Sequence, residues 1–375
     1  MIARFTPTQD SPLEVPVGTL SPKAWFSWVD SRPAFVAAHL THLAHVTHTT
    51  YWRRLGRAAL AAVSAIVLLN SLWSAARANG LIPPLAEIKP DHPRLLLRGH
   101  PSAYAASLPE LRETPKDAAF GVMLERLRRD RSAAGQAMVW LLTGENGAAD
   151  RAIATLRGYR FPGDVDTFHI HRTLTQFALA YDWLYNHPGF TPEIRTEVRM
   201  QIQPLVRRGL QAADDHVFHN YIWMSAGGVA LWAWATAGDD PQSNENFERI
   251  RERFNRGLFT AWKYLDGLPS EPMGYWALYV FTPGVLALLG AQSAFEVDLV
   301  GAIRKSEGDW LARHFENVIH STLPDLRYIP WGDLQSGPNG GVTREMAGIM
   351  DATAWATQAA AGAYFGLRGV LRHLT

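Results

Sequence analysis

The stretch 221–237 is apolar all round when it is drawn as a helix, and this feature most constrains the fold. Its sequence, YIWMSAGGVALWAWATA, contains no charged residue. A helix without a polar face has to be buried on every side. Residues 275–289 have the same character. The chain is therefore expected to enclose some helices completely behind others.

Amphipathic segments alternate with these apolar ones. One such segment begins at Thr191-Pro192-Glu193, where threonine can cap a helix, proline suits the first turn and glutamate favours the positive helix end. The one-face segments are 116–131, 147–159, 191–210, 245–265 and 297–320, and the mainly apolar ones are 133–142, 167–186, 221–237, 275–289 and 345–367. Outer and inner helices thus alternate about every 45 residues.

This alternation predicts an all-α protein, since no long run alternates in the manner of a strand. An open solenoid of repeats would show a shared sequence signature, and none is visible. Fully apolar inner helices rich in small residues instead favour a closed arrangement. We expect an incomplete α/α toroid of helical hairpins, preceded by an N-terminal signal or membrane-anchor helix.

The charge balance differs along the chain. The formal net charge is only +1, which gives no strong basic footprint for nucleic acid. Residues 1–90 hold eight basic and four acidic side chains, whereas the remainder holds 28 basic and 31 acidic ones. Cysteine is absent, which excludes disulfides, a cysteine nucleophile and thiolate metal sites.

An uncharged run of 19 residues occupies positions 58–76 and follows a basic flank at 52–57. This order is typical of a signal peptide or of an anchor with its N-terminus in the cytoplasm. Cleavage after Ala78 fits the small-x-small pattern. A buried core helix is the alternative. Residues 58–78 are thus expected to export the domain 79–375 to the periplasm or outside, either released or anchored to the inner membrane.

The first 57 residues form a tail of unclear role. Its histidines recur every three residues, at His39, His42, His45 and His48. Because that spacing drifts around a helix and alternates across a strand, the four do not converge on one metal ion. We predict no metal site here and no cofactor in the chain, which also lacks a P-loop, a dinucleotide fingerprint and an HExxH pattern.

Polar and aromatic residues gather where the inner helices begin. Each could be a cap, a core aromatic or a turn residue, but four such entrances together suggest a binding site. The four clusters are 215–223 (DHVFHNYIW), 266–279 (DGLPSEPMGYWALY), 328–337 (YIPWGDLQSG) and 169–172 (HIHR).

In these stretches the sequence resembles the heparinase II/III-like and alginate lyase family, whose catalytic domains are incomplete α/α toroids. The resemblance runs in order over about residues 91–366. The resembling stretches are 92–97 (HPRLLL), 181–185 (YDWLY) with Thr191-Pro192, His219-Asn220 with Trp223 and 225–228, Asp266-Gly267 with Glu271 and 274–276, and 330–333 (PWGD).

The resemblance implies β-elimination in uronic-acid polysaccharides. It assigns Asn220 to the uronate carboxylate, with His219 as a helper, and makes Tyr275 the acid toward the departing oxygen and, in some members, also the base. A tyrosine base needs nearby positive charge, for which Arg172 and His171 are the candidates. The remaining assignments are Trp223, Trp276 and Trp331 stacking on sugar rings, and Glu271 and Asp333 binding hydroxyls or orienting the tyrosine.

Two features depart from the family. Its asparagine-histidine pairs put the histidine second, whereas His219 precedes Asn220. The familiar lyases also continue into a large β-sheet domain, which supplies a further histidine and closes the cleft. The chain is therefore expected to be a fragment or a divergent short member, or to obtain this part from a partner chain. Two alternatives remain open: a glycoside hydrolase that uses Glu271 and Asp333, and a non-catalytic glycan-binding or polysaccharide-assembly protein. The expected partner is an acidic polysaccharide substrate and not a nucleic acid, and residues 58–76 could contact a membrane.

Overall fold

The computed structural model describes residues 80–113, 118–215 and 219–321. These residues belong to the larger of two compact units, which begins at Ala75. The tail 1–57, the segment 58–78, the cluster 328–337 and the helix expected at 345–367 lie outside the described residues.

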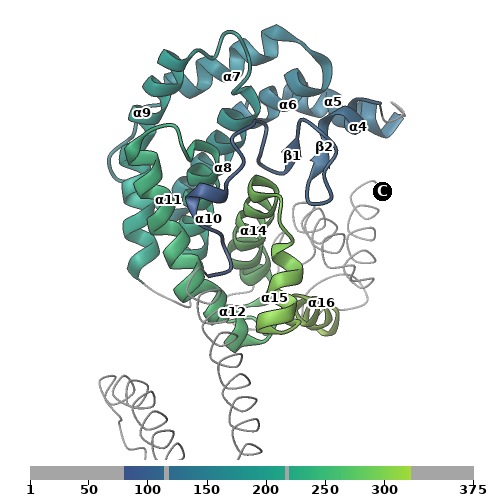
Figure 1. Cartoon of the computed structure of the whole chain (residues 1–375), viewed down its shortest axis with the longest axis vertical. Helices are drawn as coiled ribbons and strands as arrows, with labels where there is room; N and C mark the ends of the chain where they lie inside the picture. The colour runs from purple at the N-terminus through teal and green to yellow at the C-terminus, as the bar shows by residue number, and fades with distance from the viewer. Residues whose placement is uncertain (1–79, 114–117, 216–218, 322–375) are drawn as a thin grey trace, which may run out of the picture. The chain divides into compact units, whose positions relative to one another are not determined.

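The described part of the chain is an all-α assembly, as the sequence predicts (Figure 1). Its α-helices are α4 (Leu108–Glu113), α5 (Ala118–Arg129), α6 (Ala133–Thr143), α7 (Asn146–Gly158), α8 (Thr167–Leu184), α9 (Pro192–Asp215), α10 (Asn220–Thr236), α11 (Pro241–Arg253), α12 (Phe259–Leu265), α13 (Met273–Tyr275), α14 (Thr282–Phe295), α15 (Leu299–Glu307) and α16 (Trp310–His320). The remaining elements are the 3₁₀ turn η1 (Leu85–Glu87), the π-helices η2 (Phe254–Leu258) and η3 (Trp276–Phe281), and the short strands β1 (Leu97–Arg98) and β2 (Ala106–Ser107). The two strands pair in parallel, with Leu97 opposite Ala106.

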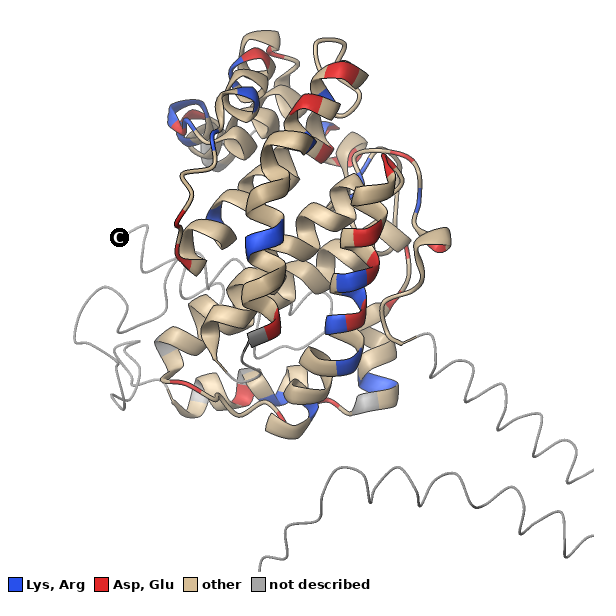
Figure 2. Ribbon diagram, turned by 90° about the vertical axis from the view of Figure 1, so that its left-hand side faces the viewer, with Lys and Arg blue, Asp and Glu red and all other residues tan. Residues whose placement is uncertain are grey.

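Helix α10 is the centre of the core. Apart from Tyr221, every residue from Asn220 to Thr236 is buried, which is the outcome expected for an apolar helix. It packs most extensively on α8 and then on α14, α9 and α11. Figure 2 shows the charged residues mainly on the outer helices and the loops, while the inner helices are largely tan.

Glycines on α10 allow its neighbours to approach closely. A Cβ atom at Gly227 would lie 2.7 Å from the carbonyl oxygen of Pro283 on α14, and one at Gly228 would lie 3.2 Å from the Cα atom of His171 on α8. These are contacts with backbone, which side-chain rotation cannot relieve. The small residues of 221–237 therefore serve helix packing, which fixes α8, α10 and α14 against one another.

The segment before β1 is held by a buried carboxylate at the end of α8. Asp182 accepts hydrogen bonds from Nδ1 of His92 at 2.6 Å and from the backbone N–H groups of Arg94 at 2.9 Å and Leu95 at 2.8 Å. Burial lowers the pKa of His92, and its hydrogen bond to Asp182 opposes that shift. We call His92, Arg94, Leu95 and Asp182 the anchor network.

Arg94 extends this network to the end of α10. Its guanidinium is only 1% exposed. It donates to the carbonyl oxygens of Ala235 at 2.8 Å, Ala237 at 2.9 Å and Lys89 at 3.0 Å. Carbonyls at a helix C-terminus lack intrahelical donors and favour a cation, so Arg94 stabilises this end of α10.

One described stretch, Trp276–Phe295, is long and apolar enough to cross a membrane, with a mean hydropathy of 1.4 over 18 residues. It is 83% buried inside the protein and packs on α10. It is therefore an inner core helix, as its place in the alternation predicts.

Candidate functional site

The predicted site residues on three different elements lie together at the starts of α8, α10 and α13. The backbone N–H of Asn220 donates to Oε1 of Glu271 at 2.8 Å, which joins the first residue of α10 to the loop before α13. Phe168 on α8 packs edge-on against Tyr221 of α10, with ring centroids 6.2 Å apart, and against Tyr279 of η3, at 5.0 Å.

Tyr275 belongs to the same group, because its ring packs edge-on against that of Tyr279 with a centroid separation of 5.3 Å. Burial raises the pKa of Tyr279, the neighbouring Tyr275 raises it further, and the charge of Arg172 opposes both effects. We call this group the entrance cluster; its members are Phe168, Arg172, Asn220, Tyr221, Glu271, Tyr275 and Tyr279.

The side chain of Asn220 has unused hydrogen-bonding capacity. The residue is 3% exposed, and its Oδ1 atom is shielded from solvent with no hydrogen-bond partner among the described residues. An unpaired buried polar atom costs about 1–3 kcal/mol, so such atoms are few in folded proteins. Helix packing alone gives no reason to keep an asparagine here, whereas a polar ligand would.

His219 caps the helix that Asn220 begins. It stands at the N-cap of α10, where its Nδ1 atom accepts from the backbone N–H of Tyr221 at 3.2 Å. The imidazole is exposed and contacts the ring of Tyr221 edge-on, with centroids 4.4 Å apart. The capping role accounts for histidine at this position, and the predicted help in binding a carboxylate remains a prediction.

His171 cannot supply the positive charge that was predicted for it. Burial lowers its pKa to about 4, although a hydrogen bond with the backbone of Met224 favours the charged form. The imidazole is therefore neutral near pH 7. Of the two predicted cations, only Arg172, which is exposed on α8, carries a charge at the entrance cluster.

The predicted sugar-stacking roles of Trp223 and Trp276 need correction, because both indoles are buried. Trp223 is 1% exposed and stacks on Trp262 with centroids 4.4 Å apart. Trp276 is 2% exposed, and its Nε1–H donates to Nδ1 of His314 at 3.0 Å. Burial lowers the pKa of His314 to about 3, so this acceptor stays neutral. Neither ring has a face open to a sugar.

Three further aromatic residues of the entrance cluster were not singled out from the sequence: Phe168, Tyr221 and Tyr279. Tyr221 is 46% exposed and is the aromatic face that solvent reaches most readily here. A signal existed for Tyr279, since it follows Tyr275 by four residues and therefore shares its helix face. Trp331 and Asp333, also predicted for the site, lie outside the described residues.

The residues described by the structure include no group of three or more histidine, aspartate or glutamate side chains able to hold a metal ion. The sequence matches no protein-family model, and no curated protein is detectably similar to it. The case for a function therefore depends on the chemistry of the entrance cluster.

Proposed function

We propose that this protein is an exported lyase on an incomplete α/α toroid, which cleaves uronic-acid polysaccharides by β-elimination at the entrance cluster. The observation that carries the proposal is the meeting of Asn220, Glu271, Tyr275 and Arg172 from three chain segments. The resemblance to the heparinase II/III-like and alginate lyase family supports the same assignment. An exported location is supported by the basic flank and apolar run that end at residue 76.

The reaction needs three things from the protein. The uronate carboxylate must be neutralised, so that the proton on the adjacent ring carbon becomes acidic; the amide of Asn220 and the charge of Arg172 suit that role. A base removes the proton, and a carbon–carbon double bond forms as the glycosidic carbon–oxygen bond breaks. An acid then protonates the departing oxygen.

Tyr275 is proposed to perform both proton transfers. Its phenolate takes the ring proton, and the phenol so formed gives that proton to the departing oxygen, which leaves the enzyme unchanged. Arg172, whose charge acts on the adjacent Tyr279, is proposed to supply the positive charge that a tyrosine base needs. Tyr221, rather than the buried tryptophans, is proposed to stack on a sugar ring, since it combines 46% exposure with an edge contact that orients it.

A second candidate function is glycan binding without turnover. It is favoured by the 3% exposure of Asn220, because a substrate carboxylate has to reach the amide for catalysis to occur. The hydrolase alternative receives no such support: the Glu271 carboxylate already accepts the Asn220 N–H, and its expected partner Asp333 lies outside the described residues.

One assay distinguishes these functions. The full chain is incubated with alginate, heparan sulfate, hyaluronan and polygalacturonate, and the ultraviolet absorbance of unsaturated uronides is followed. We expect absorbance to grow with one of them and the rate to fall at least about 100-fold in Tyr275→Phe, the scale of a lost acid–base group. Tyr264→Phe is the matched control, because that tyrosine is 80% exposed and lies outside the cluster.

The other outcomes point elsewhere. New reducing ends without ultraviolet absorbance would indicate a hydrolase. Retention on an immobilised uronate with neither product would indicate glycan binding. Turnover that survives both Tyr275→Phe and Asn220→Ala would show that the entrance cluster is not the active site.

A further inference from the structure

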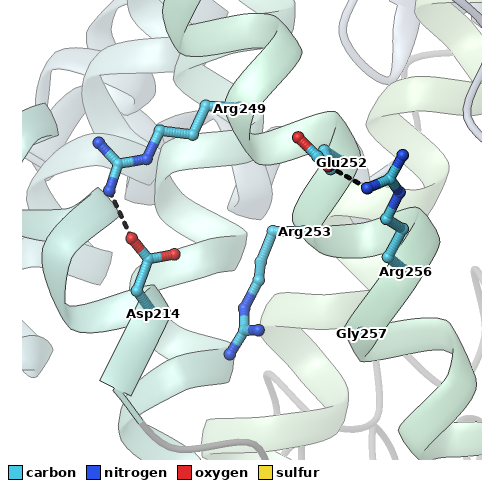
Figure 3. A pocket seen from close by; sticks show the side chains of 6 residues that line it. All are labelled: Asp214, Arg249, Glu252, Arg253, Arg256 and Gly257. Carbon is cyan, nitrogen blue, oxygen red and sulfur yellow. Dashed lines mark hydrogen bonds and ion pairs between the residues drawn. The ribbon is translucent and has the colours of Figure 1, made fainter. Parts of the chain in front are cut away.

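A second polar site lies on the outer helices and is lined by none of the residues of the entrance cluster. It is a pocket of about 360 Å³ between the ends of α9 and α11 and the π-helix η2 (Figure 3). Its volume falls near the lower end of the range for small-molecule sites. The lining residues are Asp214, Arg249, Glu252, Arg253, Arg256 and Gly257.

The charges around this pocket do not balance. Arg249 forms an ion pair with Asp214, and Arg256 forms one with Glu252 at 2.6 Å (Figure 3). Arg253 stands between these two pairs and has no carboxylate partner among the described residues. With three arginines and two carboxylates, the lining carries an excess positive charge, and it is centred on Arg253.

The Arg253 guanidinium makes one hydrogen bond within the described residues. Its Nε–H donates to the carbonyl oxygen of Ala213 at 2.8 Å, near the end of α9. Through that bond Arg253 helps to hold the C-terminal end of α9. Its Nη2 atom, however, is shielded from solvent and has no acceptor in the described residues. A guanidinium presents five N–H donors in a planar fork, which matches the oxygens of a carboxylate, sulfate or phosphate.

The backbone leaves room beside this guanidinium. Gly257 lies in η2, the π-helix that interrupts the α11–α12 run. A Cβ atom at this position would lie 3.4 Å from Nη1 of Arg253, in ordinary contact with it, so glycine leaves this side of the fork uncovered. Single-turn π-helices within α-helices are frequent at functional sites.

We propose that this pocket binds one oxyanion, the carboxylate or sulfate of an acidic sugar or a free phosphate or sulfate ion, through Arg253. The anion accepts from the terminal N–H groups of Arg253 and neutralises the excess charge. Asp214 and Glu252 hold the two flanking guanidinium groups and repel a second anion, which restricts the pocket to one group. This inference does not depend on the proposed β-elimination.

The test measures anion binding to the full chain by calorimetry and thermal shift at constant ionic strength. The probes are inorganic phosphate, inorganic sulfate and galacturonate, with galactose as the neutral counterpart of the last and chloride as the background ion. We expect saturable binding of at least one oxyanion and none of galactose. Binding of phosphate or sulfate alone identifies a free ion as the ligand, and preference for galacturonate identifies an acidic sugar.

Three variants assign the binding to Arg253. Arg253→Gln keeps a donor for the Ala213 carbonyl but removes the charge, and is expected to weaken binding at least about tenfold, as for a lost charge-assisted hydrogen bond. Arg304→Gln removes an equal charge from the Arg304–Asp309 pair on another helix and should leave the affinity unchanged. Arg253→Lys keeps the charge but replaces the planar fork by a single ammonium group, so it should also weaken binding, though less than Arg253→Gln does.

The proposal is overturned if no oxyanion binds the unmodified protein, or if Arg253→Gln binds as the unmodified protein does. It is also overturned if Arg304→Gln weakens binding equally, since the effect would then be one of net charge. Should Arg253→Gln not fold, unchanged affinity in Arg253→Lys overturns the proposal, because the guanidinium fork would then not be what holds the anion. None of these measurements involves the lyase assay, so the two proposals fail separately.

Discussion

At the end of α8, the carboxylate of Asp182 accepts hydrogen bonds from three donors, whereas at the start of α10 the amide oxygen of Asn220 accepts none among the described residues. Both groups are buried, at 0% and 3% exposure. The same pair of inner helices therefore has paired polar groups at one end and an unpaired one at the other. Pairing at the Asp182 end fixes the chain before β1, and its absence at the Asn220 end leaves an acceptor for a ligand.

The two ends also differ in which side chains solvent reaches. Arg94, in the anchor network, is 1% exposed and donates to carbonyl oxygens of three residues. Arg172 and Tyr221, in the entrance cluster, are exposed. A charge buried among acceptors stabilises a fold, and an exposed one is available to bind. Mutations at the two ends should accordingly separate stability from function.

The largest effect is expected for Asp182→Asn. The amide turns donors toward the N–H groups of Arg94 and Leu95 and leaves buried groups unpaired, so the free energy of unfolding should fall by about 3–5 kcal/mol. Chemical denaturation measures the change. The control is Asp309→Asn, which breaks an exposed pair with Arg304 and should cost less than about 1 kcal/mol. Equal losses in the two variants would show that the buried Asp182 contributes no more to stability than an exposed ion pair. The Asp182 end would then not differ from the Asn220 end in the way described above.

The next effect is a dependence on pH. His171 has a pKa of about 4 in the folded protein, below the unperturbed value of 6.5, because most of its imidazole is shielded from water. Between these values the unfolded chain binds a proton that the folded protein does not, so stability falls as the pH is lowered. For one histidine the slope approaches about 1.4 kcal/mol per pH unit well below 6.5.

Unfolding curves between pH 6.5 and about 4 test this linkage. His171→Gln should lose stability less steeply on acidification than the unmodified protein. The slopes of the two proteins should differ by the contribution of one histidine. His314→Gln should do the same, because burial lowers the pKa of His314 to about 3. If stability falls with pH as steeply in His171→Gln as in the unmodified protein, water reaches the His171 imidazole. His171 would then be able to carry a charge next to the entrance cluster.

The sequence predicted the helical class and the inner helix at 221–237 because both depend on local patterns. That helix is α10, Asn220–Thr236. It also predicted a common location for Asn220, Glu271 and Tyr275, since all three stand at the starts of inner helices. What joins them, the 2.8 Å bond from the Asn220 backbone to Glu271, depends on how two segments pack and leaves no trace in either one.

The tryptophans show where such reasoning fails. Trp223 and Trp276 stand near inner-helix starts, and the sequence does not reveal which way their rings point. In the structure Trp223 stacks on Trp262 and Trp276 donates to His314, both far away in the sequence. The neutral state of His171 was missed for the same reason, because burial is a property of the assembled fold. The pocket at Arg253 was missed as well, since it depends on a π-helix that has no simple sequence signal.

A smaller effect is expected for Glu271→Gln. The variant keeps an acceptor for the Asn220 N–H but loses the negative charge at the positive end of α10, so the free energy of unfolding should fall by about 1 kcal/mol. Glu125→Gln is the control, since Glu125 forms an exposed pair with Arg128 on α5. A loss of several kcal/mol for Glu271→Gln would show that Glu271 mainly stabilises the fold and is not part of a binding site.

The smallest stability effect, and the most informative, is expected for Asn220→Ala. The substitution breaks no side-chain hydrogen bond in the described structure, and the backbone N–H still donates to Glu271. Removal of the unpaired Oδ1 stabilises the protein and the lost packing contacts of a buried side chain oppose that gain, so the net change should be less than about 0.5 kcal/mol. The matched control is Asn246→Ala. Asn246 is also 3% exposed, but it exchanges two hydrogen bonds with Gln203, at 2.9 and 3.3 Å. Its loss leaves Gln203 without these partners and should cost about 1–3 kcal/mol.

Turnover or glycan binding should show the reverse order, lost in Asn220→Ala and retained in Asn246→Ala. If Asn220→Ala instead destabilises the protein as much as the control does, the amide is structural and the entrance end resembles the anchor end.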